Sequence, residues 1–491
     1  MFKPPASNQR LDLIALALLY RTSGKRPNSC VERPEARGGL RVAIGILGGG
    51  LAGLTIAAHL DHDCEVLEKE SRGGGHCQTV QEQGFTYDAG GPHIIFSRNQ
   101  EMVDYMVALL GDNVHRARRN NKIFYKGRYV KYPFENGLFD LDPQDRFECL
   151  YHYIKNDYPP PQTNFKEWIY HHFGKGLAEK YLIPYNEKIW NVPAEELGLE
   201  WVEGRVPKPP IEDVIKAAVG VETEGYTHQL YFHYPAHGGI ESLPRAMREC
   251  VHNLVPDFPV ERIWKEGSRW CVSNSQSAQG QSSQGQSTRR YDALVSTIPI
   301  QELAASLDGT PPEILTAVNA LRYNSLVTVT IGLNTARLPD YTAIYVPDPE
   351  VRFHRLSFPA SFSPHNAPPG QTIIQAEITT NPGDGTHELT DEELLADVIH
   401  DLQDMDLVRR SEVCYSRVLR TKYGYVVQND DCRRHLHRAK AYFEQIGIPL
   451  CGRVAEFEYI NMDVCIERAR KIADRLNREA LVPRDPVEAA V

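Results

Sequence analysis

The ten cysteines of this 491-residue chain form no CxxC pair, and the sequence holds no GxSxG, HExxH or Walker motif. Scattered single thiols argue against a disulfide framework or a zinc site, and they favour a reduced, cytoplasmic protein. The missing motifs remove the usual signatures of α/β-hydrolases, zinc proteases and P-loop nucleotidases. His171 and His172 have no carboxylate or thiol at ligand spacing, so we expect no metal site.

Long apolar runs and an excess of positive charge are also missing. No run reaches the roughly 20 residues of a transmembrane helix, and the net charge of −10 argues against non-specific binding to nucleic acid. The apolar stretch 11–20 (LDLIALALLY) is short, contains Asp12 and lacks a clear small-residue cleavage site. We therefore predict a flexible N-terminal extension over residues 1–39, with a cleaved signal sequence as the alternative.

A glycine-rich turn follows this extension. The apolar, β-prone run 42–47 leads into Gly48-x-Gly50-x-x-Gly53, and a second strand-like run ends at Glu68. This order of strand, turn, helix and strand is the fingerprint of a dinucleotide-binding βαβ unit. The fingerprint includes an acidic residue about 20 positions after the first glycine. The pattern therefore predicts a dinucleotide site; the alternative is a glycine-rich turn in an ordinary α/β domain.

Each position in this unit has a physical role. Gly48 permits the tight turn, Gly50 lets the backbone approach a pyrophosphate, and Gly53 lets the helix pack close to the strand. The helix N-terminus directs free N–H groups and a partial positive charge at the phosphates. Glu68 is expected to accept hydrogen bonds from a ribose, and its negative charge disfavours the 2′-phosphate of NADP.

The nucleotide-binding domain is predicted to be discontinuous, with three segments: 40–100, 235–310 and 445–480. Between them we predict a mostly helical inserted region at 101–234 and a sheet-containing substrate region at 311–444, where strand-like alternation is clear. The Ser/Gln/Gly tract 273–290 cannot bury a core, so it is predicted to form a flexible hairpin tip.

Several separate sequence blocks resemble one known group of proteins. The blocks are GGGLAGL (48–54), GFTYDAGGPHIIFS (84–97), YVKYPFENGL (129–138), IPYNEKIWNVP (183–193), GRVPKP (204–209), YPAHGGIESL (234–243), LVSTIP (294–299), RLSFPASFSPHN (355–366) and GRVAEFEYINMDVCIERA (452–469). In this order they resemble the UDP-galactopyranose mutase branch of the FAD-dependent amine oxidase and protoporphyrinogen oxidase-like superfamily. The resemblance runs from about residue 41 to 476.

The resemblance implies an α/β fold: a Rossmann-like FAD-binding domain with an inserted helical and antiparallel-sheet substrate region. FAD is the implied cofactor, with Glu68 on the adenosine ribose. The residues implied along the diphosphate are Gly48, Gly50, Gly53, Gly74 and Gly75. The residues implied beside the flavin are His93, Arg453, Asn461 and Met462, of which Asn461 is also predicted to cap the last helix.

The resemblance also implies a redox-neutral pyranose/furanose mutase that acts on a nucleotide-diphosphate sugar through N5 of the reduced flavin. His93 and Arg355 are the implied catalytic residues. The implied substrate-binding residues are Tyr185, Trp190, Arg205, Lys208, Arg355 and Tyr459. A reductant for the flavin is needed, and NAD(P)H is a candidate.

Other functions stay open. The main alternative is an FAD-dependent oxidoreductase of the amine oxidase or protoporphyrinogen oxidase type, and a further one is a flavin-binding scaffold. Ile183 stands where some members of the mutase branch carry an arginine, and Asn461 stands where many carry an aspartate. Basic residues near the flavin would favour the mutase, whereas an apolar tunnel or an aromatic cage would favour the oxidoreductase.

Overall fold

The computed structural model describes residues 43–479, apart from 162, 200, 203–205, 207, 226–229 and 276–286. The predicted N-terminal extension and the middle of the Ser/Gln/Gly tract lie outside the described residues. No helix in the described ranges has both the length and the apolar character that crossing a membrane requires.

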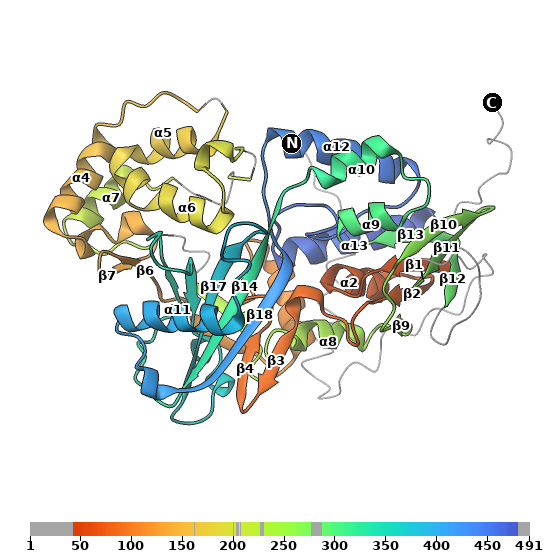
Figure 1. Cartoon of the computed structure of the whole chain (residues 1–491), viewed down its shortest axis with the longest axis horizontal. Helices are drawn as coiled ribbons and strands as arrows, with labels where there is room; N and C mark the ends of the chain where they lie inside the picture. The colour runs from red at the N-terminus through yellow and green to blue at the C-terminus, as the bar shows by residue number, and fades with distance from the viewer. Residues whose placement is uncertain are drawn as a thin grey trace, which may run out of the picture.

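A parallel sheet forms the centre of the nucleotide-binding domain, on the right of Figure 1. Its strands, in spatial order, are β13 (Ala293–Ser296), β1 (Ala43–Leu47), β2 (Asp63–Leu67) and β9 (Leu254–Val255). Helix α2 (Leu51–His59) follows β1 and packs against α13 (Met462–Glu479), through Ile56, Ala469 and Ala473 among others. The start, middle and end of the chain therefore meet in one α/β layer, as the α/β prediction requires.

Smaller elements surround this sheet. They are the hairpin β3 (Thr79–Glu82) and β4 (Phe85–Asp88), helices α3 (Gln100–Leu110), α8 (Ser242–Arg248) and α9 (Ile300–Ser306), the pair β5 (His115–Arg118) and β8 (Tyr231–Tyr234), and the sheet β10 (Arg262–Glu266), β11 (Arg269–Ser273) and β12 (Thr288–Tyr291). Strands β11 and β12 are antiparallel neighbours. The tract at 273–290 thus connects two paired strands, the position of a hairpin tip.

A seven-stranded sheet forms the second large layer. Its strands, in spatial order, are β18 (Val413–Val426), β14 (Tyr323–Leu333), β17 (Thr372–Thr380), β16 (Arg355–Ser357), β15 (Ala343–Tyr345), β6 (Asn121–Tyr125) and β7 (Arg128–Lys131). Helix α11 (Asp391–Asp404) buries Leu394, Val398 and Leu402 against it. Strands β6 and β7 come from the region predicted to be mostly helical. They belong to this sheet because β6 pairs in parallel with β15, far along the chain.

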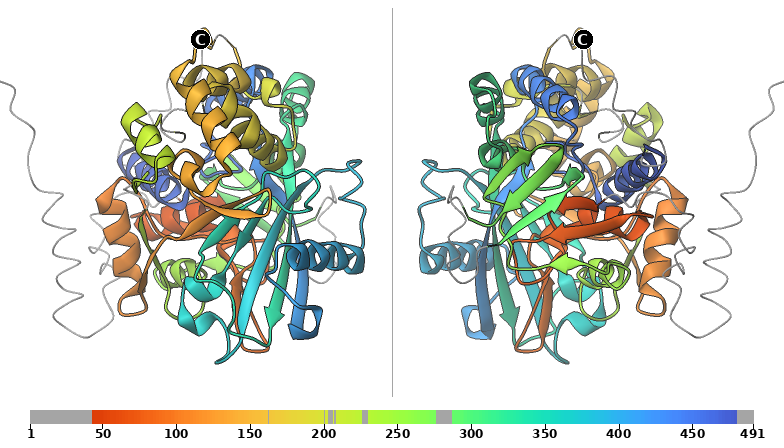
Figure 2. Two further views of the ribbon diagram at one scale, coloured as in Figure 1. Left: turned by 90° about the vertical axis from the view of Figure 1, so that its left-hand side faces the viewer. Right: turned by 90° about the vertical axis from the view of Figure 1, so that its right-hand side faces the viewer.

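Helix α12 (Asp430–Gln445) also differs from the sequence-based division. It lies within the 311–444 region, yet its Ala439 and Phe443 join the apolar cluster around Leu303 and Ile314 beside the nucleotide-binding domain. Its neighbour there is α10 (Pro312–Asn319). The side views in Figure 2 show the long strands of the large sheet (green to blue) below the gold helices of the inserted region.

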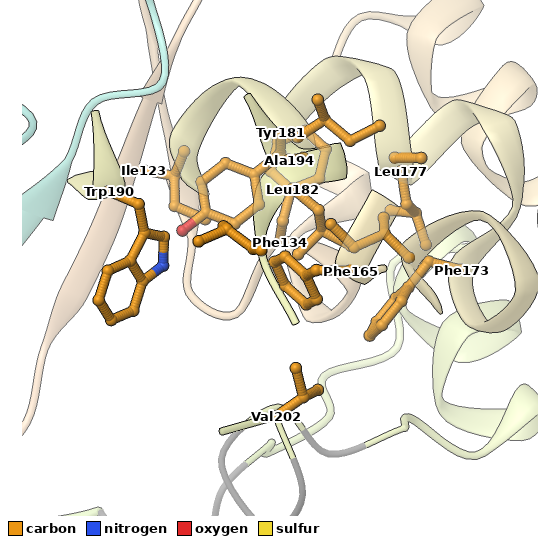
Figure 3. Close-up of a cluster of buried hydrophobic side chains, with 14 of the residues drawn as sticks. Ile123, Phe134, Phe165, Phe173, Leu177, Tyr181, Leu182, Trp190, Ala194 and Val202 are labelled. Carbon is orange, nitrogen blue, oxygen red and sulfur yellow. The ribbon is translucent and has the colours of Figure 1, made fainter. Parts of the chain in front are cut away.

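The inserted region is a helical layer with its own core (Figure 3). Its helices are α4 (Pro143–Ile154), α5 (Phe165–Leu177), α6 (Ile183–Trp190) and α7 (Ile211–Ala218). Residues 165–190 do not form one regular helix: Gly174 has a non-helical φ of +67° within α5, and one π-helical turn (Ala178–Leu182) separates α5 from α6. A Cβ at Gly174 would lie 2.2 Å from the His152 carbonyl oxygen, so α4 and α5 pack backbone to backbone here.

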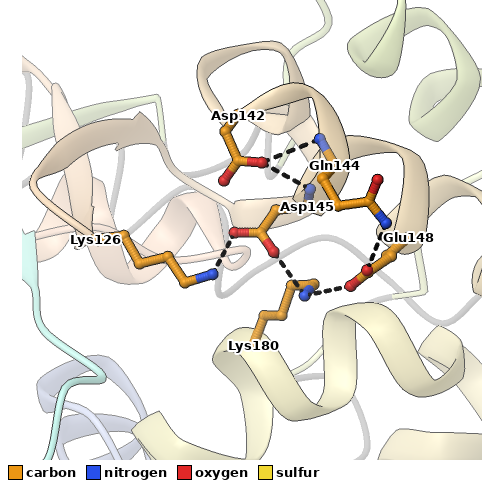
Figure 4. Close-up of polar contacts among 6 residues, drawn as sticks. All are labelled: Lys126, Asp142, Gln144, Asp145, Glu148 and Lys180. Carbon is orange, nitrogen blue, oxygen red and sulfur yellow. Dashed lines mark hydrogen bonds and ion pairs between the residues drawn. The ribbon is translucent and has the colours of Figure 1, made fainter.

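An ionic cluster fixes the π-helical turn in place (Figure 4). Lys180 contacts Asp145 and Glu148 of α4, each at 2.7 Å, and Lys126 contacts Asp145 at 2.7 Å. The two lysines hold the pKa of the Asp145 carboxyl well below its usual range, against the effect of partial burial. This cluster joins the β6–β7 turn, α4 and the π-helical turn that precedes α6, and α6 carries aromatic residues that line the site described next.

Candidate functional site

A cleft of about 1210 Å³ lies between the nucleotide-binding domain, the large sheet and α6. Its wall begins at the ends of β1 and β2, passes the start of α13, and continues to β15, β16 and β18. This volume exceeds the roughly 300–1,000 Å³ of common small-molecule pockets. The cleft can therefore hold a dinucleotide and a second molecule end to end.

The glycine turn at one end of the cleft has the predicted geometry. Gly48 has a φ of +98°, a left-handed conformation that side chains disfavour. A Cβ at Gly53 would lie 2.0 Å from the Gly48 carbonyl oxygen, so α2 sits directly against the turn. The structure thus requires glycine at Gly48 for the tight turn and at Gly53 for the close packing of α2.

A second glycine pair lies beside the first turn. Gly50 and Gly74 form a parallel bridge, and the Gly74 N–H donates to the Gly49 carbonyl at 2.8 Å. Gly75 has a φ of +55°, and the nearest atom to a Cβ at Gly50 is the Gly75 Cα at 3.8 Å. Bare backbone from two separate turns thus lines the floor of the cleft, which suits a pyrophosphate.

Glu68 lies beside this floor and is nearly buried. Its Oε2 accepts from the Gly49 N–H at 2.7 Å, and its Oε1 accepts from the Glu70 N–H at 2.9 Å. Burial raises the pKa of the Glu68 carboxyl, and these two hydrogen bonds partly offset the rise. Each carboxylate oxygen has a second lone pair, so Glu68 can brace the turn and accept from a ribose hydroxyl at once.

Replacing Glu68 with alanine is expected to yield a pale or colourless protein. The substitution removes a charged acceptor, worth about 1.5–3 kcal/mol to the nucleotide, and leaves the buried Gly49 N–H without its partner. Flavin absorbance per protein after purification measures the effect. Glu68→Gln keeps an acceptor oxygen and should retain more colour; an Ala variant as yellow as the parent would refute the role of Glu68.

His93 lines the middle of the cleft. Its Nδ1 lies 2.8 Å from the Gly91 carbonyl oxygen, which can only accept, so Nδ1 carries the proton. Burial lowers the pKa of His93 to about 4, and the positive charges of Arg453 and Arg355 add to this shift. The imidazole is therefore neutral at pH 7, with an acceptor lone pair on Nε2.

Asp88, which the sequence reasoning missed, holds the His93 loop. Its carboxylate accepts from the His93 backbone N–H at 3.2 Å, from the Tyr234 hydroxyl at 2.7 Å and from the Ile240 N–H at 3.1 Å. Burial raises the pKa of Asp88 to about 6 despite these donors. One buried acid thus connects the loop before His93 to the segment after β8.

His93 should make folding stability depend on pH between about 6.5 and 4. The unfolded histidine takes up a proton near pH 6.5, whereas the folded one resists protonation until a pKa of about 4. The unfolded state therefore binds more protons in this window, and stability falls as pH falls through it. Urea unfolding of the wild type and of His93→Gln measures this: the variant should show a shallower pH dependence. An unchanged slope would contradict the assignment.

Arg453 and the start of α13 form the wall next to His93. The Arg453 Nη2 donates to the Gly424 carbonyl at 2.9 Å, and its guanidinium lies 4.5 Å from the centre of the Tyr459 ring. Its Nε is buried and has no hydrogen-bond partner within the described residues. A cofactor with ring carbonyls or phosphate oxygens would satisfy this donor.

Asn461 and Met462, which the resemblance implies beside the flavin, line the cleft. The Asn461 carbonyl accepts from the Cys465 N–H at 3.0 Å, which is the first hydrogen bond of α13. Asn461 therefore occupies the position that precedes the helix, and the N–H groups after it point out of the helix toward the cleft. Such N–H groups stabilise negative charge on a bound ring.

Arg355 lies at the far end of the cleft and forms a bidentate pair with Glu377. Its Nε and Nη2 donate to the two carboxylate oxygens, each at 2.6 Å, on the directly paired strands β16 and β17. Burial alone would lower the pKa of Arg355, but the charge of Glu377 keeps it well above its ordinary value. Glu377 is fully buried, and the sequence reasoning did not include it.

Aromatic side chains complete this end. Of the predicted residues, Tyr185, Trp190 and Tyr459 line the cleft, and the ring centres of Trp190 and Tyr459 are 5.4 Å apart. Burial raises the pKa of the Tyr185 hydroxyl well above its ordinary value, so this hydroxyl stays protonated. Four further tyrosines of the cleft were missed: Tyr132, Tyr345, Tyr423 and Tyr425.

Arg119 is a second arginine that the sequence reasoning missed. It follows β5, lines the cleft, and places its guanidinium 4.8 Å from the centre of the Phe96 ring. Burial lowers the pKa of Arg119, and repulsion from Arg355 contributes to the lowering. The only signal in the sequence was the run HRARR at 115–119, which does not say which arginine turns inward.

Two predicted substrate residues are not placed in the cleft. Arg205 lies outside the described residues. Lys208 is exposed and is not among the residues that line the cleft; its charge acts on His172 of α5 instead. The described residues also contain no group of three or more His, Cys, Asp or Glu side chains that could hold a metal ion.

The parallel βαβ layer, the double glycine turn and the long cleft beside them define a dinucleotide-binding flavoprotein of the Rossmann type. The chain belongs to the flavin containing amine oxidoreductase family, whose model matches residues 51–476. It is an FAD-dependent enzyme. The glycine floor, the Glu68 carboxylate and the buried Nε of Arg453 fit that cofactor.

Three solved structures show how widely this fold is shared. A reduced UDP-galactopyranose mutase is 24% identical, with a TM-score of 0.80 over 90% of this chain and 95% of that one. A protein described as a putative protoporphyrinogen oxidase from Exiguobacterium sp. 255-15 is 18% identical, with a TM-score of 0.71 over 90% and 100%. A putrescine oxidase bound to putrescine is 15% identical, with a TM-score of 0.64 over 89% and 99%.

Proposed function

We propose that this enzyme is a redox-neutral mutase that interconverts the ring forms of a nucleoside-diphosphate sugar. The observation that carries the proposal is that two arginines, Arg119 and Arg355, line the cleft beside strands β6 and β16 of the large sheet, whereas the glycine floor belongs to the nucleotide-binding domain. Burial is the main cause of the lowered pKa of Arg119, and repulsion from Arg355, which is itself paired with Glu377, makes a smaller contribution. A diphosphate between them would relieve this repulsion and accept from planar guanidinium donors.

The second arginine of the cleft, Arg119, comes from a different part of the chain than the arginine that some members of the mutase branch carry. Ile183 stands where they carry an arginine, and here it is buried in the core of the helical layer. Arg119 comes from a different element, the end of β5, and provides positive charge at the same end of the cleft. The absence of an arginine before Pro184 is thus compatible with a diphosphate site.

Reduced FAD would supply, through N5, the nucleophile for the anomeric carbon, with the nucleoside diphosphate as leaving group. The chain's own residues then have three tasks. Arg119 and Arg355 stabilise the charge that develops on the leaving diphosphate. The tyrosine wall excludes water from the sugar. Neutral His93 accepts a hydrogen bond at Nε2 and can hold a proton there during ring opening and closure.

The direct test is an anaerobic incubation. The holoenzyme is reduced with dithionite and mixed with UDP-galactose, and the products are separated by chromatography. The mutase proposal expects an isomeric nucleotide sugar to appear only with reduced enzyme, while the flavin stays reduced. Oxidised enzyme is the matched control. No isomer from UDP-galactose or from a panel of other nucleotide sugars would refute the proposal.

An oxidoreductase of the amine oxidase or protoporphyrinogen oxidase type is the second candidate. The aromatic wall favours it: the rings of Tyr132 and Tyr345 are 4.7 Å apart, and Tyr345 meets Tyr185 edge-on at 5.4 Å. Such a wall also suits an apolar or cationic substrate. This candidate predicts that an amine or a porphyrinogen bleaches the oxidised flavin under anaerobic conditions and that oxygen restores the colour.

Arg119→Ala should weaken binding of UDP by about tenfold to a hundredfold, the equivalent of the roughly 1.5–3 kcal/mol of a charge-assisted hydrogen bond. Isothermal titration of UDP into the holoenzyme measures the change. Arg116→Ala is the matched control, because Arg116 lies on β5, three residues before Arg119, but is exposed and contacts the Tyr231 ring. Equal losses in both variants would indicate a general electrostatic effect and would contradict a specific role for Arg119.

A further inference from the structure

A short row of side chains on the large sheet lines the cleft but has no part in the steps described so far. Three strands bring one residue each to it: Asn121 of β6, Ala343 of β15 and Ser357 of β16. Ala343 pairs in register with Ser357 on one side and with Asn121 on the other, so the three side chains share one face. We call this row the Ala343 recess, because alanine is the smallest cleft-lining side chain of these strands.

Ser357 gives the clearest indication that the row binds a ligand. Its side chain is 1% exposed, and its Oγ has no hydrogen-bond partner within the described residues. Its neighbour on β17, Gln375, donates instead to the Asp88 carbonyl at 3.0 Å and to the Thr330 hydroxyl at 3.3 Å. Buried hydroxyls are nearly always hydrogen-bonded, so the Ser357 Oγ requires a polar group from a molecule in the cleft.

Asn121 provides a donor at the other end of the row. Its Oδ1 accepts from the Thr342 hydroxyl at 2.6 Å, which fixes the amide with its nitrogen turned away from Thr342. The Nδ2 donates to the Tyr345 hydroxyl at a long 3.4 Å, and an amide nitrogen carries two N–H groups. The row therefore presents an amide donor, an apolar methyl group and a hydroxyl that can donate or accept.

The Ala343 recess lies between the two arginines of the cleft. Arg355 pairs with Tyr345, two residues after Ala343 on β15. Arg119 comes two residues before Asn121, which pairs in parallel with Ala343. Two residues of a strand span about 7 Å, so a diphosphate held by both arginines lies next to the recess.

The two ends of the row face different parts of the molecule. The β17 neighbour of Ser357 donates to the Asp88 carbonyl, and Asp88 holds the His93 loop, beside which the flavin is implied. At the other end, the Tyr132 N–H donates to the Asn121 carbonyl at 3.3 Å, and Tyr132 packs against the core of the helical layer. The mutase chemistry brings the sugar, rather than the nucleoside, against the flavin, so the sugar is the part of the substrate that reaches Ser357.

We propose that the Ala343 recess binds an acetamido group (–NH–CO–CH₃) on the sugar, so that the substrate is a nucleoside-diphosphate N-acetylamino sugar. This inference rests on the mutase function proposed above. The row matches the group atom by atom: the Asn121 N–H donates to the carbonyl, the Ser357 Oγ accepts from the N–H, and the methyl group packs on Ala343. A hydroxyl in place of the acetamido group is shorter and cannot meet both polar ends of the row.

A comparison of two nucleotide sugars tests the recess. The dithionite-reduced holoenzyme is incubated anaerobically with UDP-galactose or with UDP-N-acetylgalactosamine, and kcat/KM is measured for each. The wild type is expected to favour the acetamido sugar by about tenfold or more, the value of one to two hydrogen bonds. Ala343→Leu should fill the recess and reverse this preference. Ser357→Ala should reduce the preference about tenfold, whereas Ser357→Thr, which keeps the hydroxyl, should retain it.

Ser296→Ala is the matched control, because the Ser296 Oγ is also buried and has no partner within the described residues, but Ser296 does not line the cleft. It should keep the wild-type preference. Flavin content and the unfolding temperature, measured for every variant, separate a change of preference from a loss of the fold.

The outcomes distinguish the recess from the mutase function. No isomer from either sugar would count against the mutase function and would overturn this inference with it. Isomerisation of UDP-galactose with an equal or higher kcat/KM than the acetamido sugar would overturn the recess alone, as would an unchanged preference in Ser357→Ala. An equal loss of affinity for UDP, which lacks the sugar, in Ser357→Ala would assign the hydroxyl to the diphosphate and would also overturn the inference.

Discussion

Glu377→Ala should lower the free energy of unfolding by about 3–5 kcal/mol. Glu377 is fully buried, and both of its oxygens accept from Arg355 at 2.6 Å. Removing one partner of a buried ion pair leaves the other charge without compensation, and this loss exceeds the net value of the intact pair. Urea unfolding of the purified holoprotein measures the difference.

A matched pair at the surface provides the control. Arg322 and Glu196 form an ion pair with side chains that are 52% and 44% exposed, so Glu196→Ala should cost at most about 1 kcal/mol. Inorganic pyrophosphate should stabilise Glu377→Ala more than it stabilises the wild type, because an anion in the cleft can replace the missing carboxylate beside Arg355. If Glu377→Ala were as stable as Glu196→Ala, the buried pair would not support this end of the cleft.

Gly50→Ala and Gly53→Ala should separate cofactor binding from folding. A Cβ at Gly53 would lie 2.0 Å from the Gly48 carbonyl oxygen, so Gly53→Ala must displace α2 and is expected to destabilise the protein by more than about 1–3 kcal/mol. A Cβ at Gly50 has no atom of the described residues closer than 3.8 Å, so the fold should tolerate it. It would still occupy the glycine floor that we propose for the pyrophosphate.

We therefore expect Gly50→Ala to unfold at nearly the temperature of the apo wild type but to bind FAD at least about tenfold more weakly, or about 1.4 kcal/mol. Thermal unfolding with and without added FAD, together with flavin fluorescence during titration, measures both quantities. Normal FAD affinity in Gly50→Ala would contradict the position of the diphosphate. A fully stable Gly53→Ala would contradict the close packing of α2.

Local patterns predicted the nucleotide end of the molecule. The strand before Gly48, the helix after it and Glu68 at the end of the next strand all depend on residues close in sequence, and the structure places them as predicted. The helix at 100–110 and the helix at 462–479 also follow from local periodicity. The α/β class and a dinucleotide site could therefore be inferred from local patterns, whereas FAD itself was implied by the family resemblance.

The other end of the cleft depends on long-range pairing. Glu377 faces Arg355 only because β16 and β17 pair in one particular register, which no short motif specifies. Arg119 turns inward because β5 pairs with β8, more than a hundred residues later. Strands β6 and β7 lie in a region predicted to be mostly helical, and their place in the large sheet depends on the pairing of β6 with β15, which is remote in the sequence.

Two residues that the resemblance implied in the substrate site, Lys208 and Arg205, have different outcomes. Lys208 matched a basic stretch of the resembling group, but its side chain is exposed beside α5 rather than in the cleft. Arg205, in the same stretch, lies outside the described residues. A motif match identifies residue types, whereas the packing of the helical layer decides which of them face the ligand.

The central claim is that FAD and an anionic ligand share one cleft, with Arg355 and Arg119 facing the ligand. Titration of UDP into the oxidised holoenzyme, followed by visible flavin absorbance, tests it most directly. We predict a saturable change of the flavin spectrum in the wild type that needs about tenfold or more UDP in Arg119→Ala. An unchanged spectrum at saturating UDP, or the same titration curve in both proteins, would contradict it.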